Sequence, residues 1–201
     1  MTGEHRRGGA FLLWHLCAAV PGRYASKVKT LVTYRSKYGS TRQYAQWIAD
    51  ELGADIMPVE DVDPSRLALY DTVIVGGYVR MGTIIGSEFI VRQWDALRKK
   101  DVMLFSVAGA PAHVPDRIHW FERSLPQHIH EQVTHFALRG RSRDLDLRDR
   151  LLIAFPKTLL RISAYFKPSD AKKKAIAGFS PFDAVLRETT APIIAHVRSL
   201  A

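Results

Sequence analysis

The feature that most constrains the fold of this chain is a regular alternation of short apolar runs with amphipathic segments. The run at 71–77 is apolar on both faces, which is typical of a strand inside a parallel sheet. The segment at 41–52 instead places Tyr44, Ile48 and Leu52 at helical spacing on one face. This alternation predicts an α/β fold on an open, doubly wound, five-stranded parallel sheet with helices on both faces. Strands are predicted at 29–34, 55–59, 71–77, 101–109 and 132–138, and helices at 41–52, 87–99, 115–125 and 182–200.

Glycine and proline mark where these elements end. Gly53 follows the first helix as a stop signal, and Pro58 predicts either a strand end or an edge strand. Pro192 lies within the last helical segment, where it predicts either a kink or a late helix start.

Two stretches lie outside the alternation. Residues 1–27 form an N-terminal extension in which two arginines precede an apolar stretch, typical of a signal peptide. A plain upstream extension and an interfacial anchor fit the same pattern. The folded domain is predicted over 28–201, and it contains an insertion at 139–180 that is too apolar at its centre for a linker.

The positive charge of the chain is concentrated in the insertion. The net charge is +9, and between Arg139 and Lys174 there are eleven lysines and arginines against four aspartates. Such a balance favours an anionic partner, whether nucleic acid, lipid headgroups or an acidic substrate. The single cysteine, Cys17, excludes an intrachain disulfide and a cysteine-rich metal site.

The loop between the first strand and the first helix predicts an anion site. Residues 35–41 are small, polar and basic, and they lead into a helix whose N-terminal amides point together. Ser36, Ser40 and Thr41 add hydroxyl donors, and Gly39 permits a tight turn. An ordinary helix cap explains the same residues equally well on this loop alone.

Two further loops are predicted at the carboxyl ends of the next two central strands, where such sheets bind ligands. The loop at 77–86 combines Tyr78 and Arg80 with glycines, a mixture that suits a flat polar ring. The loop at 107–115 is small and rich in proline and glycine, so its backbone can approach a ligand closely.

These three loops together resemble those of the flavodoxin-like family, over about residues 29–200. The resemblance implies the sheet order 2-1-3-4-5 and flavin mononucleotide (FMN) as the cofactor. It implies that no side chain is catalytic, because the flavin carries the redox chemistry. The implied phosphate contacts are Ser36, Lys37, Tyr38, Gly39, Ser40 and Thr41, and the residues beside the isoalloxazine are Gly77, Tyr78, Val79, Arg80, Met81, Gly82, Val107, Ala108, Gly109 and Ala110.

Within that family the chain most resembles the bacterial menaquinone-dependent protoporphyrinogen oxidases of heme biosynthesis. The resemblance rests on Tyr34 to Thr41, on Gly76 to Gly82, on Phe105-Ser106-Val107 and on the basic insertion before the last helix. It implies electron transfer from a porphyrinogen-type substrate through FMN to a quinone. It also implies a cytoplasmic protein with peripheral membrane contact through the insertion. The residues expected to contact the substrate carboxylates or lipid headgroups are Arg139, Arg141, Arg143, Arg148 and Arg150.

Other functions remain open from the sequence. A flavodoxin-type electron carrier has the same loops, although such carriers are usually acidic. A quinone reductase fed by a nicotinamide lacks any recognised nicotinamide-binding motif here. A nucleic-acid binder accounts for the charge but not for the three loops, so no nucleic-acid partner is predicted. The histidines at 128–135 have poor spacing for a metal, and no metal is predicted.

Overall fold

A computed structural model describes residues 28–110, 116–141 and 182–200. The predicted N-terminal extension and most of the predicted insertion therefore lie outside the described residues. In the order of the chain the elements are β1 Thr30–Tyr34, α1 Ser40–Leu52, β2 Asp55–Pro58, η1 Val59–Asp61, η2 Pro64–Leu69, β3 Thr72–Arg80, β4 Thr83–Ile85, α2 Glu88–Arg92, α3 Trp94–Leu97, β5 Asp101–Ala108, α4 Asp116–Ser124, α5 Gln127–His130, β6 Val133–Arg139, η3 Arg187–Thr190 and α8 Ala191–Ser199.

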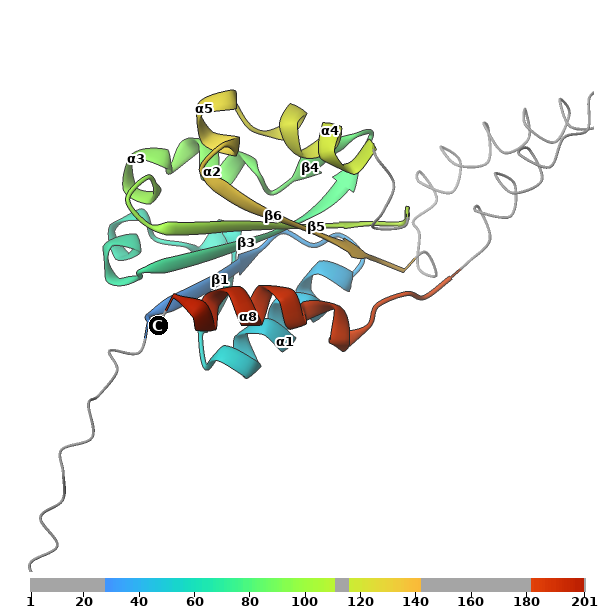
Figure 1. Ribbon diagram of the computed structural model, residues 1–201, viewed down its shortest axis with the longest axis horizontal. Coiled ribbons are helices and arrows are strands. Elements are labelled where there is room, and N and C mark those ends of the chain that lie inside the picture. Colours follow the sequence, from blue (N-terminus) through green and yellow to red (C-terminus); the bar gives the residue numbers. More distant parts are fainter. Residues whose placement is uncertain (1–27, 111–115, 142–181, 201) are drawn as a thin grey trace, which may run out of the picture.

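The five predicted strands form one parallel sheet in the predicted order. The sheet runs β2-β1-β3-β5-β6, which corresponds to 2-1-3-4-5 when the five predicted strands are numbered along the chain. The pairs β1–β2, β1–β3, β3–β5 and β5–β6 are all parallel. Helices α1 and α8 cover one face, and α2 to α5 cover the other (Figure 1). The prediction of a doubly wound sheet with helices on both faces is confirmed.

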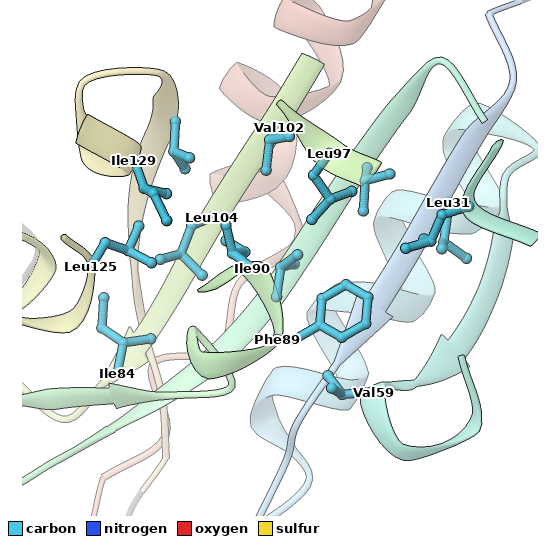
Figure 2. Packing of buried hydrophobic residues seen from close by; sticks show 14 of the residues in the cluster. Leu31, Val59, Ile84, Phe89, Ile90, Leu97, Val102, Leu104, Leu125 and Ile129 are labelled. Carbon is cyan, nitrogen blue, oxygen red and sulfur yellow. The ribbon is translucent and has the colours of Figure 1, made fainter. Parts of the chain in front are cut away.

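Each face of the sheet has its own hydrophobic core, because successive strand residues point to opposite faces. On the α1 and α8 face, Val32, Ile74 and Phe105 pack with Ile48 and Ile193. Figure 2 shows the other core, in which Leu31 and Leu104 from the strands meet helix residues such as Phe89, Ile90 and Leu97. Burying each of these side chains contributes about 1.5–3 kcal/mol.

The structure corrects two of the predicted helices. The helix predicted at 87–99 is interrupted at Gln93, whose backbone (φ −103°, ψ 14°) leaves the helical region, so α2 and α3 are two short helices. The last helix does not begin near residue 182. It begins at Ala191 with Pro192 in its first turn. A backbone N–H in the first turn has no acceptor within the helix, so the missing N–H of proline costs nothing there. Of the two meanings of Pro192, the late start is therefore the correct one.

The signals at Gly53 and Pro58 are confirmed. Gly53 ends α1 in the left-handed conformation (φ +61°), which a residue with a side chain rarely adopts. Pro58 is the last residue of β2, and β2 lies at the edge of the sheet. In the parts of the chain that the structure describes, no helix combines the length and apolar character needed to cross a membrane.

Candidate functional site

The loop between β1 and α1 is where the sequence predicts an anion site. Gly39 precedes the first helical residue with φ +81°, and an added Cβ there would meet no atom within 4 Å. Among the described residues no side chain caps the helix, so the amides of its first turn are left for another acceptor. That turn, Ser-Thr-Arg-Gln, contains no acidic residue to oppose a bound anion. The amides of this turn are therefore available as donors to the predicted phosphate, and the phosphate contacts themselves stay a prediction.

The Ser36 hydroxyl is the clearest sign of a missing partner. Its Oγ is buried, yet within the described residues it has no hydrogen-bond partner. A buried hydroxyl without a partner costs roughly 1–3 kcal/mol, so such atoms are rare unless a ligand satisfies them. The Ser40 hydroxyl, by contrast, already accepts a hydrogen bond from the Arg141 amide (3.3 Å) and keeps its own proton for donation. Ser40 and Thr41 are both buried in the first turn of α1.

The charges beside this loop are arranged unevenly. Arg35 lies between Glu60 (2.9 Å) and Glu88, and Glu88 also accepts the Gly86 amide (2.6 Å). This pairing raises the pKa of the Arg35 guanidinium, chiefly through its hydrogen bond to Glu88. The Lys37 ammonium lies 4.9 Å from the centre of the Tyr38 ring. Arg35 therefore joins the loop to η1 and α2 as a neutralised cation.

The second predicted loop is not a loop, and that prediction is wrong. β3 continues to Arg80 and pairs in antiparallel fashion with β4, so that 72–85 forms a hairpin with a turn at Met81-Gly82. Both turn residues have positive φ (49° and 76°), as a two-residue hairpin turn requires. Met81 is 81% exposed at the tip.

The two glycines of this segment serve close packing, not flexibility. A Cβ on Gly76 would lie 2.3 Å from the Phe105 ring, and one on Gly77 would lie 2.6 Å from both Ile84 and the Ile85 carbonyl oxygen. Tyr78 pairs with Val107 of β5 and stands on a rigid strand at the carboxyl edge. The predicted flavin contacts Gly77 to Gly82 thus belong to a hairpin beside the site, and their contact with the ring stays a prediction.

The third predicted segment ends β5 and is held by an arginine that the sequence did not single out. Val107 and Ala108 are the last buried residues of β5, and Gly109 and Ala110 follow in a bend. Arg117 of α4 donates hydrogen bonds to the carbonyls of Ala108 (3.3 Å) and Ala110. It also donates to Leu138 at the end of β6 (2.9 Å). The buried guanidinium of Arg117 therefore holds this segment from the side of α4.

Arg139 and Arg141, two of the arginines predicted to contact the substrate or lipid, lie at the carboxyl end of β6. The Arg139 guanidinium lies 5.1 Å from the centre of the Phe182 ring, and that ring packs against Gly109. Arg141 forms an ion pair with Asp183 (3.8 Å) and an antiparallel bridge with it. Arg143, Arg148 and Arg150 lie outside the described residues.

The described ends of the insertion are anchored beside the anion site. The Tyr44 hydroxyl of α1 donates to the Arg139 carbonyl (2.7 Å) and accepts the Leu186 amide (3.2 Å). The Gly140 amide donates to the Ala108 carbonyl (2.9 Å). The chain thus leaves the sheet and returns to it within reach of the first turn of α1.

The histidines do not form a metal site in the part of the chain that the structure describes, where no suitable group of three ligands occurs. His135 bonds the Ser106 hydroxyl (2.9 Å) and stacks on Phe121, with ring centres 4.5 Å apart. Burial and, to a smaller extent, the charge of Arg117 lower the pKa of His135 to about 4.

The fold and this edge define a doubly wound α/β protein whose first helix starts shortly after the carboxyl end of the central strand β1. Residues 31–161 match the family described as Flavodoxin domain. Because that match covers more than half of the chain, the protein belongs to the flavodoxin domain family. This membership confirms the resemblance at the level of the family.

Individual relatives are more distant. An uncharacterized protein of Methanocaldococcus jannaschii is 33% identical over 85 residues, which are 42% of this chain and 57% of that protein. The chain thus spans little more than half the length of this curated relative. A flavodoxin from the domain Archaea has a TM-score of 0.46 at 14% identity and covers 85% of this chain and 99% of its own. A flavoprotein in complex with FMN from Lactobacillus acidophilus NCFM has a TM-score of 0.39 at 14% identity. The match covers 56% of this chain and 92% of that protein.

FMN is the cofactor of this family, and the residues present fit it. The buried Ser36 hydroxyl, the uncapped first turn of α1 and the open space at Gly39 supply donors and room for its phosphate. The predicted cofactor is confirmed, while the individual contacts stay predictions.

Proposed function

We propose that this protein is an FMN-dependent oxidoreductase that passes electrons from a porphyrinogen-type substrate through FMN to a quinone. The observation that carries the proposal is the position of the insertion. Its described root, Gly140 and Arg141, lies on the first turn of α1, where the Arg141 amide bonds the Ser40 hydroxyl. The arginine-rich segment therefore starts beside Ser40, one of the predicted phosphate contacts.

The residues of the site divide the work between binding and orientation. The loop at 35–41 binds the phosphate, and the rigid strand ends at Tyr78 and Val107 limit where the ring can lie. Bound FMN supplies the acceptance and release of two electrons. The chain contributes position, exclusion of water and charge.

The basic insertion supports a substrate with carboxylates. Arg139 and Arg141 stand at its root, and the sequence from Arg139 to Lys174 carries eleven basic residues against four aspartates. A porphyrinogen with propionate groups meets such a surface through charge-assisted hydrogen bonds. The apolar residues of the same sequence support contact with a membrane, where a lipid-soluble quinone resides. The cytoplasmic location with peripheral membrane contact belongs to this proposal.

A flavodoxin-type electron carrier that serves a partner redox protein is the second candidate. Membership of the flavodoxin domain family favours it equally. The net charge of +9 favours the oxidase, because a carrier with this charge needs an acidic partner.

One purified preparation tests both candidates. The visible spectrum reports bound FMN, and protoporphyrinogen oxidation is then followed with a menaquinone analogue as acceptor. Turnover supports the oxidase. Bound FMN without turnover contradicts the oxidase and leaves the carrier, and absence of flavin contradicts both.

A pair of matched variants tests the role of the insertion root. Arg141→Gln should raise the KM for the porphyrinogen several-fold with little change in kcat, because it removes a carboxylate contact. Arg187→Gln is the control, since Arg187 is likewise an ion-paired arginine, bonded to Glu51 (3.3 Å) on α1. Equal effects of the two substitutions would count against substrate binding at the root.

A further inference from the structure

Arg117 is a buried cation that has no acidic partner among the residues that the structure describes. It is 2% exposed, and among the described residues its hydrogen-bond acceptors are the carbonyls of Ala108, Ala110 and Leu138. Its Nε is buried without a partner. Buried charges are ordinarily paired with an opposite charge, so this arrangement calls for an explanation.

Arg139, the cation that acts on Arg117 electrostatically, has a charge of the same sign. Burial and, to a smaller extent, the Arg139 guanidinium lower the pKa of Arg117 to about 10. Arg117 still carries its proton at neutral pH. Carbonyl dipoles stabilise it in part, and an anion that forms beside it would complete the compensation.

The place of Arg117 indicates which anion that is. It holds the carboxyl ends of β5 and β6, and two of its acceptors lie in the segment Val107–Ala110 that is expected to flank the flavin ring. Arg35, beside the phosphate loop, is instead balanced by Glu60 and Glu88. Among the described residues, Arg35 in the predicted phosphate loop is therefore neutralised, whereas Arg117 has no acidic partner and holds the segment expected to flank the ring.

We propose that Arg117 stabilises the reduced form of the flavin relative to the oxidised form and so makes the bound cofactor a better electron acceptor. The proposal rests on the proposed FMN site. Reduction adds two electrons and one proton to the neutral ring and leaves one negative charge on it. A fixed positive charge in a buried environment favours this form over the neutral one. An oxidase needs such an acceptor, whereas a low-potential carrier does not.

The test compares the affinity of each variant for oxidised and reduced FMN. Fluorescence titration gives the Kd of oxidised FMN, and a dithionite titration against a reference dye gives the midpoint potential. Arg117→Met should weaken the binding of reduced FMN at least about tenfold more than that of oxidised FMN. A tenfold difference lowers the two-electron midpoint potential by about 30 mV.

Two further variants separate charge from structure. Arg117→Lys keeps the charge but loses the forked hydrogen bonds, so it should keep most of the potential even if its thermal stability falls. Arg92→Met removes one exposed charge from α2 and should leave the potential unchanged. Equal weakening of both oxidation states in Arg117→Met, or an equal shift in Arg92→Met, would overturn the proposal.

The wild-type protein provides a measurement that needs no variant. If the reduced ring stays anionic, its potential should change by about 30 mV per pH unit, one proton for two electrons, to well below neutral pH. A slope of about twice that value near pH 6 means a neutral reduced ring and overturns the proposal, even where Arg117→Met does not fold. Loss of FMN from the wild-type protein overturns the proposed function as well. FMN bound with an unchanged potential in Arg117→Met overturns only the role of Arg117.

Discussion

Ser36→Ala should leave the stability of the apo protein equal or slightly higher, and it should weaken the binding of FMN. The Ser36 Oγ is buried, and within the described residues it bonds nothing. Alanine lacks this hydroxyl. The substitution therefore removes a polar atom that loses its contact with water on folding and has no partner among the described residues. The usual consequence of deleting a buried hydroxyl, a loss of stability, should therefore be absent.

The magnitudes follow from the two states of the site. A buried hydroxyl without a hydrogen bond costs roughly 1–3 kcal/mol, so the free energy of unfolding of apo Ser36→Ala should stay equal or rise by up to about 1 kcal/mol. A hydrogen bond to a charged group such as a phosphate is worth about 1.5–3 kcal/mol. At about 1.4 kcal/mol per factor of ten, its loss should raise the Kd of FMN at least about tenfold.

Urea unfolding of the apo protein and fluorescence titration with FMN measure the two effects. Ser124→Ala is the matched control, because the Ser124 hydroxyl accepts the Ile84 amide (2.8 Å) and donates to the Trp120 carbonyl. Ser124→Ala should lower the free energy of unfolding by about 1–2 kcal/mol and leave the Kd unchanged. If Ser36→Ala destabilises the apo protein as Ser124→Ala does while the Kd stays the same, Ser36 has a structural role and the phosphate is bound elsewhere.

Three further predictions concern the scaffold around the site. Tyr44→Phe removes the hydroxyl that joins α1 to Arg139 and Leu186, and it should lower the free energy of unfolding by about 1–3 kcal/mol in urea; an unchanged midpoint would contradict this role. Gly77→Ala places a Cβ 2.6 Å from a backbone carbonyl of β4, so thermal unfolding should occur at a lower temperature, at a cost of about 1–3 kcal/mol, and equal stability would mean that the hairpin shifts freely. The pKa of His135 is lowered to about 4 in the folded state, below its ordinary value near 6.5, so its contribution to stability should be complete above pH 6.5 and lost as the pH falls toward 4, on the order of 3 kcal/mol in total. Urea unfolding at a series of pH values measures this dependence of the free energy of unfolding on pH. His135→Gln should lose the part of it between pH 6.5 and 4, and a dependence equal to that of wild type would contradict the role of His135.

Local pattern was sufficient to predict the strands and the phosphate loop. The strands of the sheet centre are apolar on both faces, so their period and length are visible in any short window, as at 71–77. The phosphate loop is local as well, since Tyr34 ends a strand, Gly39 turns the chain and Ser40 starts a helix. Such features arise from neighbouring residues, which is why the sheet order agrees with the prediction and the strand-to-helix turn lies where the sequence places it.

The hairpin was missed because its second strand is too short to give a pattern. β4 has three residues, and Gly76 and Gly77 before it are typical of a loop. Only the structure shows that these glycines make room for Phe105 and Ile84. Tertiary packing decided between a loop and a strand.

By itself, the sequence determined the order of the strands along the chain, the strand-to-helix turn at 35–41 and the basic character of the insertion. Tertiary structure alone decided that Arg117 lies buried against the ends of β5 and β6, and that Tyr44 bonds a carbonyl 95 residues away at Arg139. The physical reason is range. Periodicity and helix capping act over a few residues, whereas the burial of a charge depends on which distant segments the folded sheet brings together.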